Sequence, residues 1–167
     1  MKNSRWMLIP LLLAAAGCAS AGSEIPAVTG FEVEKYLGKW YEFARLPNWF
    51  ERKMTDVSAD YSRLPDGSLE VINRGMKNGK SKSVTGKLRF ADKNDTGELE
   101  VSFFTPFYSS YRIIKLAPDY RYSVVISGNG KYLWILSRTR KLDEADLIEI
   151  IDFLKKNNIP LEDLLFL

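Results

Sequence analysis

The feature that most constrains this chain is a series of short segments in which apolar and polar residues alternate, divided by turn signals. In one of them, Val57, Ala59 and Tyr61 are separated by single polar residues, which is the period of a half-buried strand. The turn signals include Asn78-Gly79 and Gly128-Asn129-Gly130, both typical of hairpins. The eight segments lie at residues 40–46, 57–61, 69–76, 84–90, 99–103, 111–116, 122–126 and 132–138. Short strands joined by short turns predict an all-β fold, an eight-stranded antiparallel up-and-down barrel with strands over about 39–138.

One amphipathic helix, expected at about 143–157, follows the last strand. Its apolar positions, Leu147, Ile150, Ile151 and Leu154, share one helical face, which favours packing on the outside of the barrel. Asp143 is the expected N-cap. Residues 164–167 form a short apolar tail that we also expect to pack.

The chain contains no histidine and one cysteine. These counts exclude a Ser-His-Asp triad, a Cys-His pair, an imidazole metal site and an internal disulfide. The candidate general acids or bases, Glu42, Asp56 and Asp60, lack the spacing of a catalytic pair. Charges of both signs, 24 basic and 21 acidic residues, are mixed along the chain, unlike a nucleic-acid-binding tail. The sequence therefore predicts no enzyme activity, no cofactor, no metal site and no nucleic-acid partner.

The amino terminus has the pattern of an export signal. Lys2 and Arg5 precede an apolar run over residues 6–16 that is too short to span a membrane. Ala15-Ala16-Gly17-Cys18 resembles a bacterial lipobox, which implies cleavage before Cys18 and acylation of that residue. Because no Asp follows Cys18, the resemblance implies an outer-membrane destination. We expect a signal peptide at 1–17, an acylated Cys18 with a tether over 18–30, and the folded domain at 31–167.

Three ordered motifs resemble the lipocalin family, in particular its bacterial lipocalin and apolipoprotein D branch. They are Gly38-Lys39-Trp40-Tyr41-Glu42, Ser102-Phe103-Phe104-Thr105-Pro106-Phe107-Tyr108 and Tyr132-Leu133-Trp134-Ile135-Leu136-Ser137-Arg138. The resemblance implies that Arg138 stacks on Trp40. The family's second motif is present as Pro118-Asp119-Tyr120, without its usual Thr.

Strand direction places these motifs together. Antiparallel strands alternate in direction, so the eighth strand ends where the first began, and the turn at Asp119 falls at the same end. An arginine over an indole ring contributes about 0.5–2 kcal/mol. We therefore interpret Gly38, Trp40, Asp119, Tyr120 and Arg138 as structural residues that close one end of the barrel.

The same alternation defines the opposite end, the predicted mouth. Its loops carry aromatic side chains beside the cations of Arg52, Lys53, Lys77, Lys80 and Lys131. This combination suits an amphiphile whose acidic head lies near the rim, although solvated cations and core-capping aromatics are the alternative. The mouth residues are Trp49, Phe50, Arg52, Phe104, Phe107 and Tyr108.

Alternation also predicts the residues that line the interior. The candidate ligand contacts are Val57, Ala59, Tyr61, Val71, Asn73, Leu88, Phe90, Phe103, Tyr111, Ile113, Val124 and Trp134, with Leu99, Val101 and Leu136 beside them. Ala59 and Gly86 leave room for a ligand. Glu42 has the parity of Trp40, so it faces inward, and a buried acid needs a partner or a raised pKa.

The resemblance implies a lipid-binding protein anchored to the outer membrane on its periplasmic face. It implies fatty acids or lysophospholipids as ligands, and it allows a homodimer through barrel faces. Two alternatives remain: a structural or docking envelope lipoprotein with a filled barrel, and a lipid-modifying enzyme built on the barrel.

Overall fold

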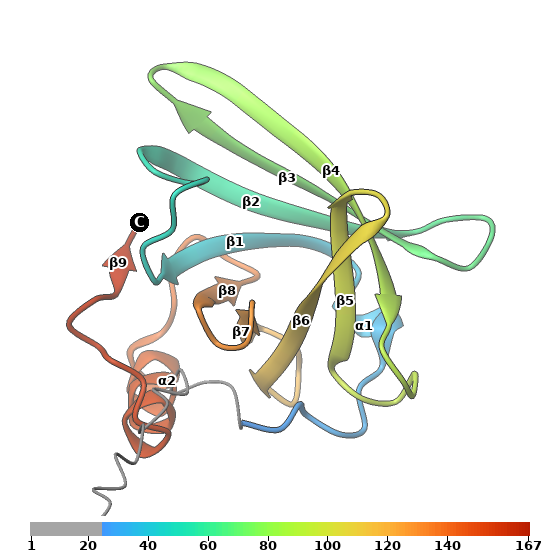
Figure 1. The fold of residues 1–167 in the computed structure, drawn as a ribbon. Helices are drawn as coiled ribbons and strands as arrows, with labels where there is room; N and C mark the ends of the chain where they lie inside the picture. The colour runs from blue at the N-terminus through green and yellow to red at the C-terminus, as the bar shows by residue number, and fades with distance from the viewer. Residues whose placement is uncertain (1–24) are drawn as a thin grey trace, which may run out of the picture.

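The structure is a computed structural model that describes residues 25–167. The predicted signal peptide and Cys18 lie outside the described residues. Eight antiparallel strands follow one another around a closed barrel (Figure 1), in which β1 pairs with both β8 and β2. The strands are β1 (Gly38–Arg45), β2 (Met54–Arg63), β3 (Leu69–Lys77), β4 (Lys80–Phe90), β5 (Glu98–Phe104), β6 (Phe107–Leu116), β7 (Tyr122–Ser127) and β8 (Tyr132–Ser137). The predicted eight-stranded up-and-down barrel is confirmed.

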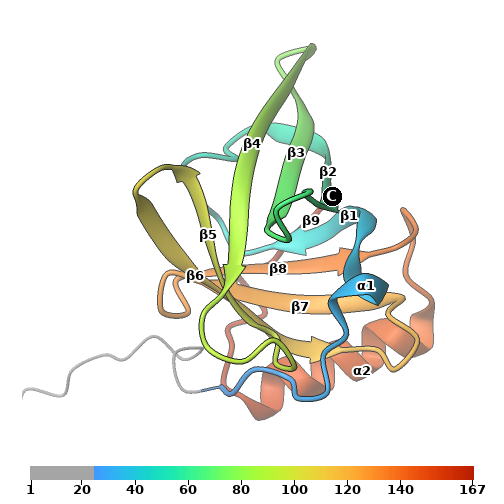
Figure 2. The ribbon, with the colours of Figure 1, turned by 90° about the vertical axis from the view of Figure 1, so that its right-hand side faces the viewer.

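The predicted helix is present as α2 (Glu144–Lys156), on the outside of the barrel (Figure 2). Ile150 and Leu154 are fully buried against outward-facing residues of β6, β7 and β8. Asp143 occupies the N-cap position, but its side chain makes no capping hydrogen bond. An apolar layer between barrel and helix therefore forms a second core, separate from the barrel interior.

Two short elements were not predicted as regular structure. The helix α1 (Val33–Tyr36) lies across one end of the barrel and buries Tyr36. The two-residue strand β9 (Leu165–Phe166) pairs with Ala44 and Arg45 of β1. Both are too short to show a hydrophobic period, so pattern analysis does not detect them.

Strand β7 is buried on both faces, and this overturns one prediction. Ser123 and Val125 face the interior, whereas Val124 belongs to the apolar layer under α2. Val124 is therefore not an interior residue. The more apolar face of this strand is the one covered by the helix, so the alternation was assigned to the wrong side.

A β-bulge in β1 changes which residues face inward. The pairing with β8 shifts between Glu42 and Ala44, so that Arg45 pairs with the inward-facing Trp134. The extra residue, Phe43, packs with the outer layer. Because of the bulge, Glu42 and Arg45, three residues apart, both point into the barrel.

The barrel widens toward one end. Pairs between β4 and β5 run only from Lys87 to Phe90, so within the described chain residues 80–86 of β4 pair with β3 alone. The β3–β4 hairpin projects past its neighbours at this end (Figure 2). We call this end the mouth, and the end closed by α1 the floor.

Candidate functional site

The floor is closed by an arginine stacked on a buried indole. The Arg138 guanidinium carbon lies 3.9 Å from the centroid of the Trp40 ring, which is fully buried. Arg138 also donates to three backbone carbonyls: Lys35 at 2.6 Å, Lys39 at 2.9 Å and Tyr120 at 3.3 Å. One side chain thereby ties together α1, β1 and the turn before β7.

The other motif residues shape the same end. Gly38 has a φ of +89°, a backbone conformation that favours glycine, whereas a Cβ added there would make only an ordinary contact with Arg138 Nη1 at 3.6 Å. The Tyr120 hydroxyl accepts from the Glu32 backbone N–H at 2.9 Å. Asp119 does not contact the stack. It accepts from Arg121 at 2.9 Å, and Arg121 in turn pairs with Asp146 of α2.

Above the floor, three tyrosine hydroxyls and a serine form a buried network. Tyr111 Oη lies 2.9 Å from Tyr36 Oη and 2.7 Å from Tyr61 Oη, and Tyr36 Oη lies 3.2 Å from Ser123 Oγ. Burial raises the pKa of Tyr36 to about 12 and those of Tyr61 and Tyr111 well above their usual value. The hydroxyls stay protonated and bind one another.

A buried triad of charged residues lies on the β1 side of the interior. Arg45 Nη1 donates to Glu42 Oε1 at 2.5 Å, and Nη2 donates to the Glu51 carbonyl at 3.0 Å. Arg45 Nε lies 3.9 Å from Glu51 Oε2. All three residues are buried. Sequence analysis missed Arg45 because the bulge reverses its side, and it missed Glu51 because a loop residue has no strand parity.

Glu51 links this triad to the mouth. Its Oε2 accepts from Trp134 Nε1 at 3.0 Å and from Asn48 Nδ2 at 2.5 Å. Its backbone N–H donates to Asn48 Oδ1 at 2.7 Å. The loop between β1 and β2 is thus held over the interior by hydrogen bonds to buried groups.

The triad changes the acidity of Glu42. Burial, followed by the neighbouring Glu51 carboxylate, raises the pKa of Glu42 to about 8, although the Arg45 guanidinium opposes the shift. The expectation that a buried Glu42 needs a partner or a raised pKa is met on both counts.

The remaining interior consists of apolar side chains. Most predicted contacts belong to one core cluster: Ala59, Tyr61, Val71, Leu88, Leu99, Val101, Tyr111, Ile113 and Leu136, with Phe90, Phe103 and Trp134 partly buried against it. Val57 is buried, and Asn73 is half-buried opposite Ala59. A Cβ added at Gly86 would lie 2.8 Å from the Phe103 ring. The room expected at Gly86 is therefore occupied by Phe103.

The mouth carries aromatic side chains in water. Trp49, Phe104 and Phe107 are each 78% exposed. Phe50 is less exposed and lies 5.3 Å, between ring centroids, from Tyr132. Tyr108 is not at the opening: its ring stacks against the Arg89 guanidinium at 4.0 Å on the outer wall. Arg52 is exposed in the loop between β1 and β2.

The candidate acid–base residues do not share a site. Glu42 is inside the barrel, whereas Asp56 pairs with Arg140 and Asp60 with Lys39 and Arg74 on the surface. Within residues 25–167, no cluster of three or more Asp, Glu, Cys or His side chains could hold a metal ion. No helix in the same range is long and apolar enough to span a membrane.

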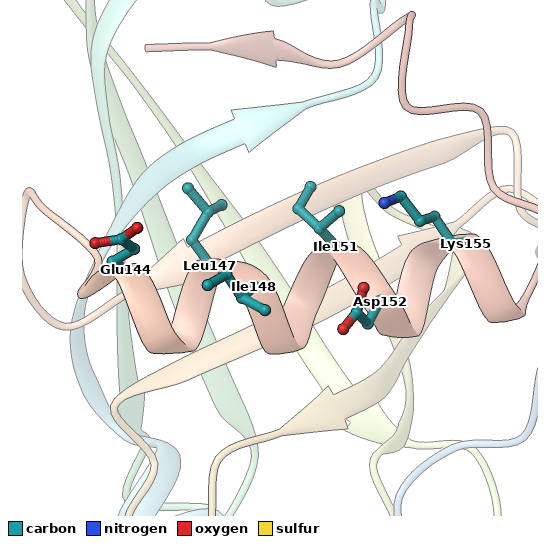
Figure 3. A pocket seen from close by; sticks show the side chains of 6 residues that line it. All are labelled: Glu144, Leu147, Ile148, Ile151, Asp152 and Lys155. Carbon is teal, nitrogen blue, oxygen red and sulfur yellow. The ribbon is translucent and has the colours of Figure 1, made fainter.

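A pocket also lies along α2, and Figure 3 shows the six side chains of that helix that line it. They are Glu144, Leu147, Ile148, Ile151, Asp152 and Lys155. It opens on the outside of the barrel and is not part of the interior described above.

Comparisons with known proteins agree with this geometry. Residues 31–164 match the model of the lipocalin-like domain. The chain is 39% identical over 153 residues to outer membrane lipoprotein Blc of Vibrio cholerae, covering 90% of each chain. It is 32% identical over 146 residues to mouse apolipoprotein D, covering 82% of this chain and 76% of the relative. Insecticyanin from the tobacco hornworm shares the fold, with a TM-score of 0.71 at 18% identity over 86% of this chain and 83% of that one.

Proposed function

This chain belongs to the lipocalin family, and from that membership we propose that it binds fatty acids or lysophospholipids in the cell envelope, for storage or transport. One observation carries the proposal. The barrel is closed at the floor by Arg138 and α1, whereas at the mouth β4 separates from β5 before Lys87 and the loops carry exposed aromatic side chains. A barrel closed at one end and open at the other suits an elongated ligand that enters with its apolar end first.

The acyl chain would lie against the wall formed by β3, β4 and β5. Val84 faces the interior opposite Asn73 and is 42% exposed, so apolar wall is accessible from the mouth. Leu88 and Phe103 continue this wall deeper into the barrel. Burial of this wall and of the acyl chain contributes about 25 cal/mol of binding free energy for each Å² of apolar area, and binding involves no covalent step.

The acidic head would remain at the rim. Lys77, Lys80 and Lys131 lie on the mouth hairpins, and a carboxylate or phosphate there would keep most of its hydration. The deeper polar groups are already satisfied: Arg45 by Glu42 and Glu51, and the tyrosines by one another. A charged head buried at that depth would compete with these hydrogen bonds and would lose its hydration.

A titration of the delipidated protein with a fluorescent fatty acid tests the proposal, with saturable binding as the expected result. Val84→Asp places a carboxylate on the accessible inner wall and should weaken binding at least tenfold, because burial beside an acyl chain penalises the charge. Thr85→Asp is the matched control, since it adds the same charge to the exposed neighbouring position, which pairs with Ile72. Absence of saturable binding, or equal losses in the two variants, would contradict the proposal.

Binding rather than catalysis is supported by the separation of the acidic residues. Glu42 is engaged by Arg45, and Asp60 is held by Lys39 at 2.8 Å on the outer wall. An enzyme that uses a pair of carboxylates as acid and base would need both at one substrate. Turnover of a lipid ester that is lost in Asp60→Ala would revive that alternative.

We further propose that the protein is anchored in the outer membrane, facing the periplasm, through acylated Cys18 after removal of residues 1–17. The lipobox-like sequence and the relatives named outer membrane lipoprotein support this location. Palmitate labelling of the full chain tests it: Cys18→Ala should abolish the label and release the protein from the membrane fraction. A labelled Cys18→Ala variant would refute it.

The second candidate is an envelope lipoprotein with a filled barrel. Occupation of the Gly86 space by Phe103 and the dense tyrosine network favour it. The fatty-acid titration separates the two candidates, because a filled barrel shows no saturable binding. The predicted homodimer is checked by sedimentation velocity, in which a single monomer boundary at all concentrations would rule it out.

A further inference from the structure

The exposed charges of the mouth loops are all of one sign. The four mouth loops, together with the tip of the β3–β4 hairpin at residues 77–82, carry six cations and one acid, and that acid, Glu51, is buried against Arg45. The nearest acid on the outer wall, Asp56, is paired with Arg140. The six cations are Arg52, Lys53, Lys77, Lys80, Lys82 and Lys131.

Within the part of the chain that the structure describes, the mouth cations also lack the carboxylate partners that several basic residues elsewhere on the barrel have. Arg63, Arg89 and Lys115 each pair with a carboxylate at 2.6–2.7 Å. Between residues 25 and 167, none of the six mouth cations forms an ion pair. Unpaired cations gathered at one end give the barrel a positive face that attracts an anionic surface.

Exposed aromatic side chains lie at the same end of the barrel as these cations. Trp49 projects from the loop between β1 and β2, and Phe104 and Phe107 face each other across the β5–β6 turn. Their high exposure is costly in water but suits the interface of a bilayer, where tryptophan and phenylalanine sit at the level of the headgroups. Cations beside such residues are attracted to anionic lipid headgroups.

We propose that the mouth docks directly onto an anionic phospholipid membrane, with Trp49, Phe104 and Phe107 inserted at the headgroup level and the six cations around them. The proposal rests on the proposed lipid-binding function, to which it adds a route: an acyl chain would pass between bilayer and barrel without crossing water. An acidic protein would match the charges but would leave three separate aromatic side chains needing pockets of its own, so the membrane fits the surface better.

Tryptophan quenching by brominated lipids tests this docking in the anchored full chain, reconstituted into vesicles. The difference between wild type and Trp49→Phe reports Trp49 alone, because the two differ only in that indole. We expect Trp49 to be quenched in phosphatidylglycerol-containing vesicles, and several-fold less in pure phosphatidylcholine. Equal quenching in both lipids, or no quenching of Trp49 in either, overturns the proposal.

Charge variants show whether the mouth itself is responsible. The triple variant Lys77→Gln/Lys80→Gln/Lys131→Gln should reduce quenching at least tenfold at low protein coverage, since each lysine near the surface accounts for about a fivefold change in partitioning. Its control, Lys87→Gln/Lys93→Gln/Lys141→Gln, removes the same charge from exposed positions away from the mouth. In this control, Trp49 should be quenched as strongly as in wild type. Similar losses in both triples contradict mouth docking.

Aromatic variants complete the test. Phe104→Ser/Phe107→Ser should lower quenching of Trp49, whereas Ile148→Ser, an exposed apolar position on α2, should not. The fatty-acid titration in solution is run on the same proteins. Saturable binding without quenching would reject mouth docking alone, whereas quenching without saturable binding would reject the proposed function and leave a membrane-docking surface.

Discussion

Replacing Arg138 with alanine removes the side chain that closes the floor, and its cost follows from four contacts. The stack on the fully buried Trp40 ring is worth about 1–2 kcal/mol, at the upper end of the cation–π range because the indole is desolvated. Three backbone carbonyls lose their donor. Two of these bonds lie near solvent, so we assign about 1 kcal/mol to each of the three. The expected loss is about 4–5 kcal/mol of unfolding free energy.

Thermal unfolding followed by circular dichroism measures this loss. For a domain of this size, 1 kcal/mol corresponds to roughly 3–4 °C, so Arg138→Ala should lower Tm by about 12–20 °C. The Tm of Arg138→Lys should lie between those of wild type and Arg138→Ala, because lysine keeps the charge but cannot reach several carbonyls at once.

Arg140→Ala is the matched control. Its guanidinium also lies over a ring, Tyr41 at 4.7 Å, and pairs with Asp56, but its side chain is 63% exposed. Exposed ion pairs contribute about 0–1 kcal/mol and exposed cation–π contacts about 0.5–1 kcal/mol, so this variant should lower Tm by no more than about 6–8 °C. An Arg138→Ala variant as stable as Arg140→Ala would refute the assignment of Arg138 as a structural residue, and so would a large loss of fatty-acid affinity in still-folded protein.

Three further predictions concern the interior. Glu42 has a pKa of about 8 in the folded state, above that of an unfolded glutamate, so the folded state binds its proton more tightly. The free energy of unfolding should therefore fall as pH rises from about 4.5 to 8. Urea unfolding across this window should show a smaller decline for Glu42→Gln, and parallel profiles of the two proteins would contradict the raised pKa. Tyr111→Phe leaves Tyr61 without its hydroxyl partner and should cost about 1–3 kcal/mol in urea unfolding, whereas Tyr108→Phe on the outer wall should cost nearly nothing. Gly86→Ala forces the Phe103 ring to move and should cost about 1–3 kcal/mol; a double-mutant cycle with Phe103→Ala should recover much of this, and strict additivity would argue against the contact.

Strand number, strand order and the floor were predictable because they depend on regular features. The alternation over 57–61 and the turn signals mark the strands, and parity alone brings Trp40 and Arg138 to one end. These inferences need only the two-residue period and the reversal at each hairpin.

The interior was less predictable, for physical reasons visible at particular residues. In β7, both faces are buried, so hydrophobicity does not distinguish Ser123, which is inside, from Val124, which is outside. In β1, the bulge is fixed by pairing with β8, and a single strand's sequence does not reveal it. Arg45 was missed for that reason. Exposure of Phe104 and Phe107 depends on how far β5 and β6 extend past the rim, which composition does not encode.

The widening between β4 and β5 has a consequence for how copies of the protein meet. A barrel normally has no free strand edge, but among residues 25–167 the segment 80–86 of β4 has one partner strand instead of two. Such an edge offers unpaired backbone groups to any other extended segment and is a site of edge-to-edge aggregation. Lys80 and Lys82 lie on it and would repel the same lysines of a second copy. At low salt this repulsion should keep the chains apart, and at high salt, where it is screened, the same edge is where we expect self-association to begin.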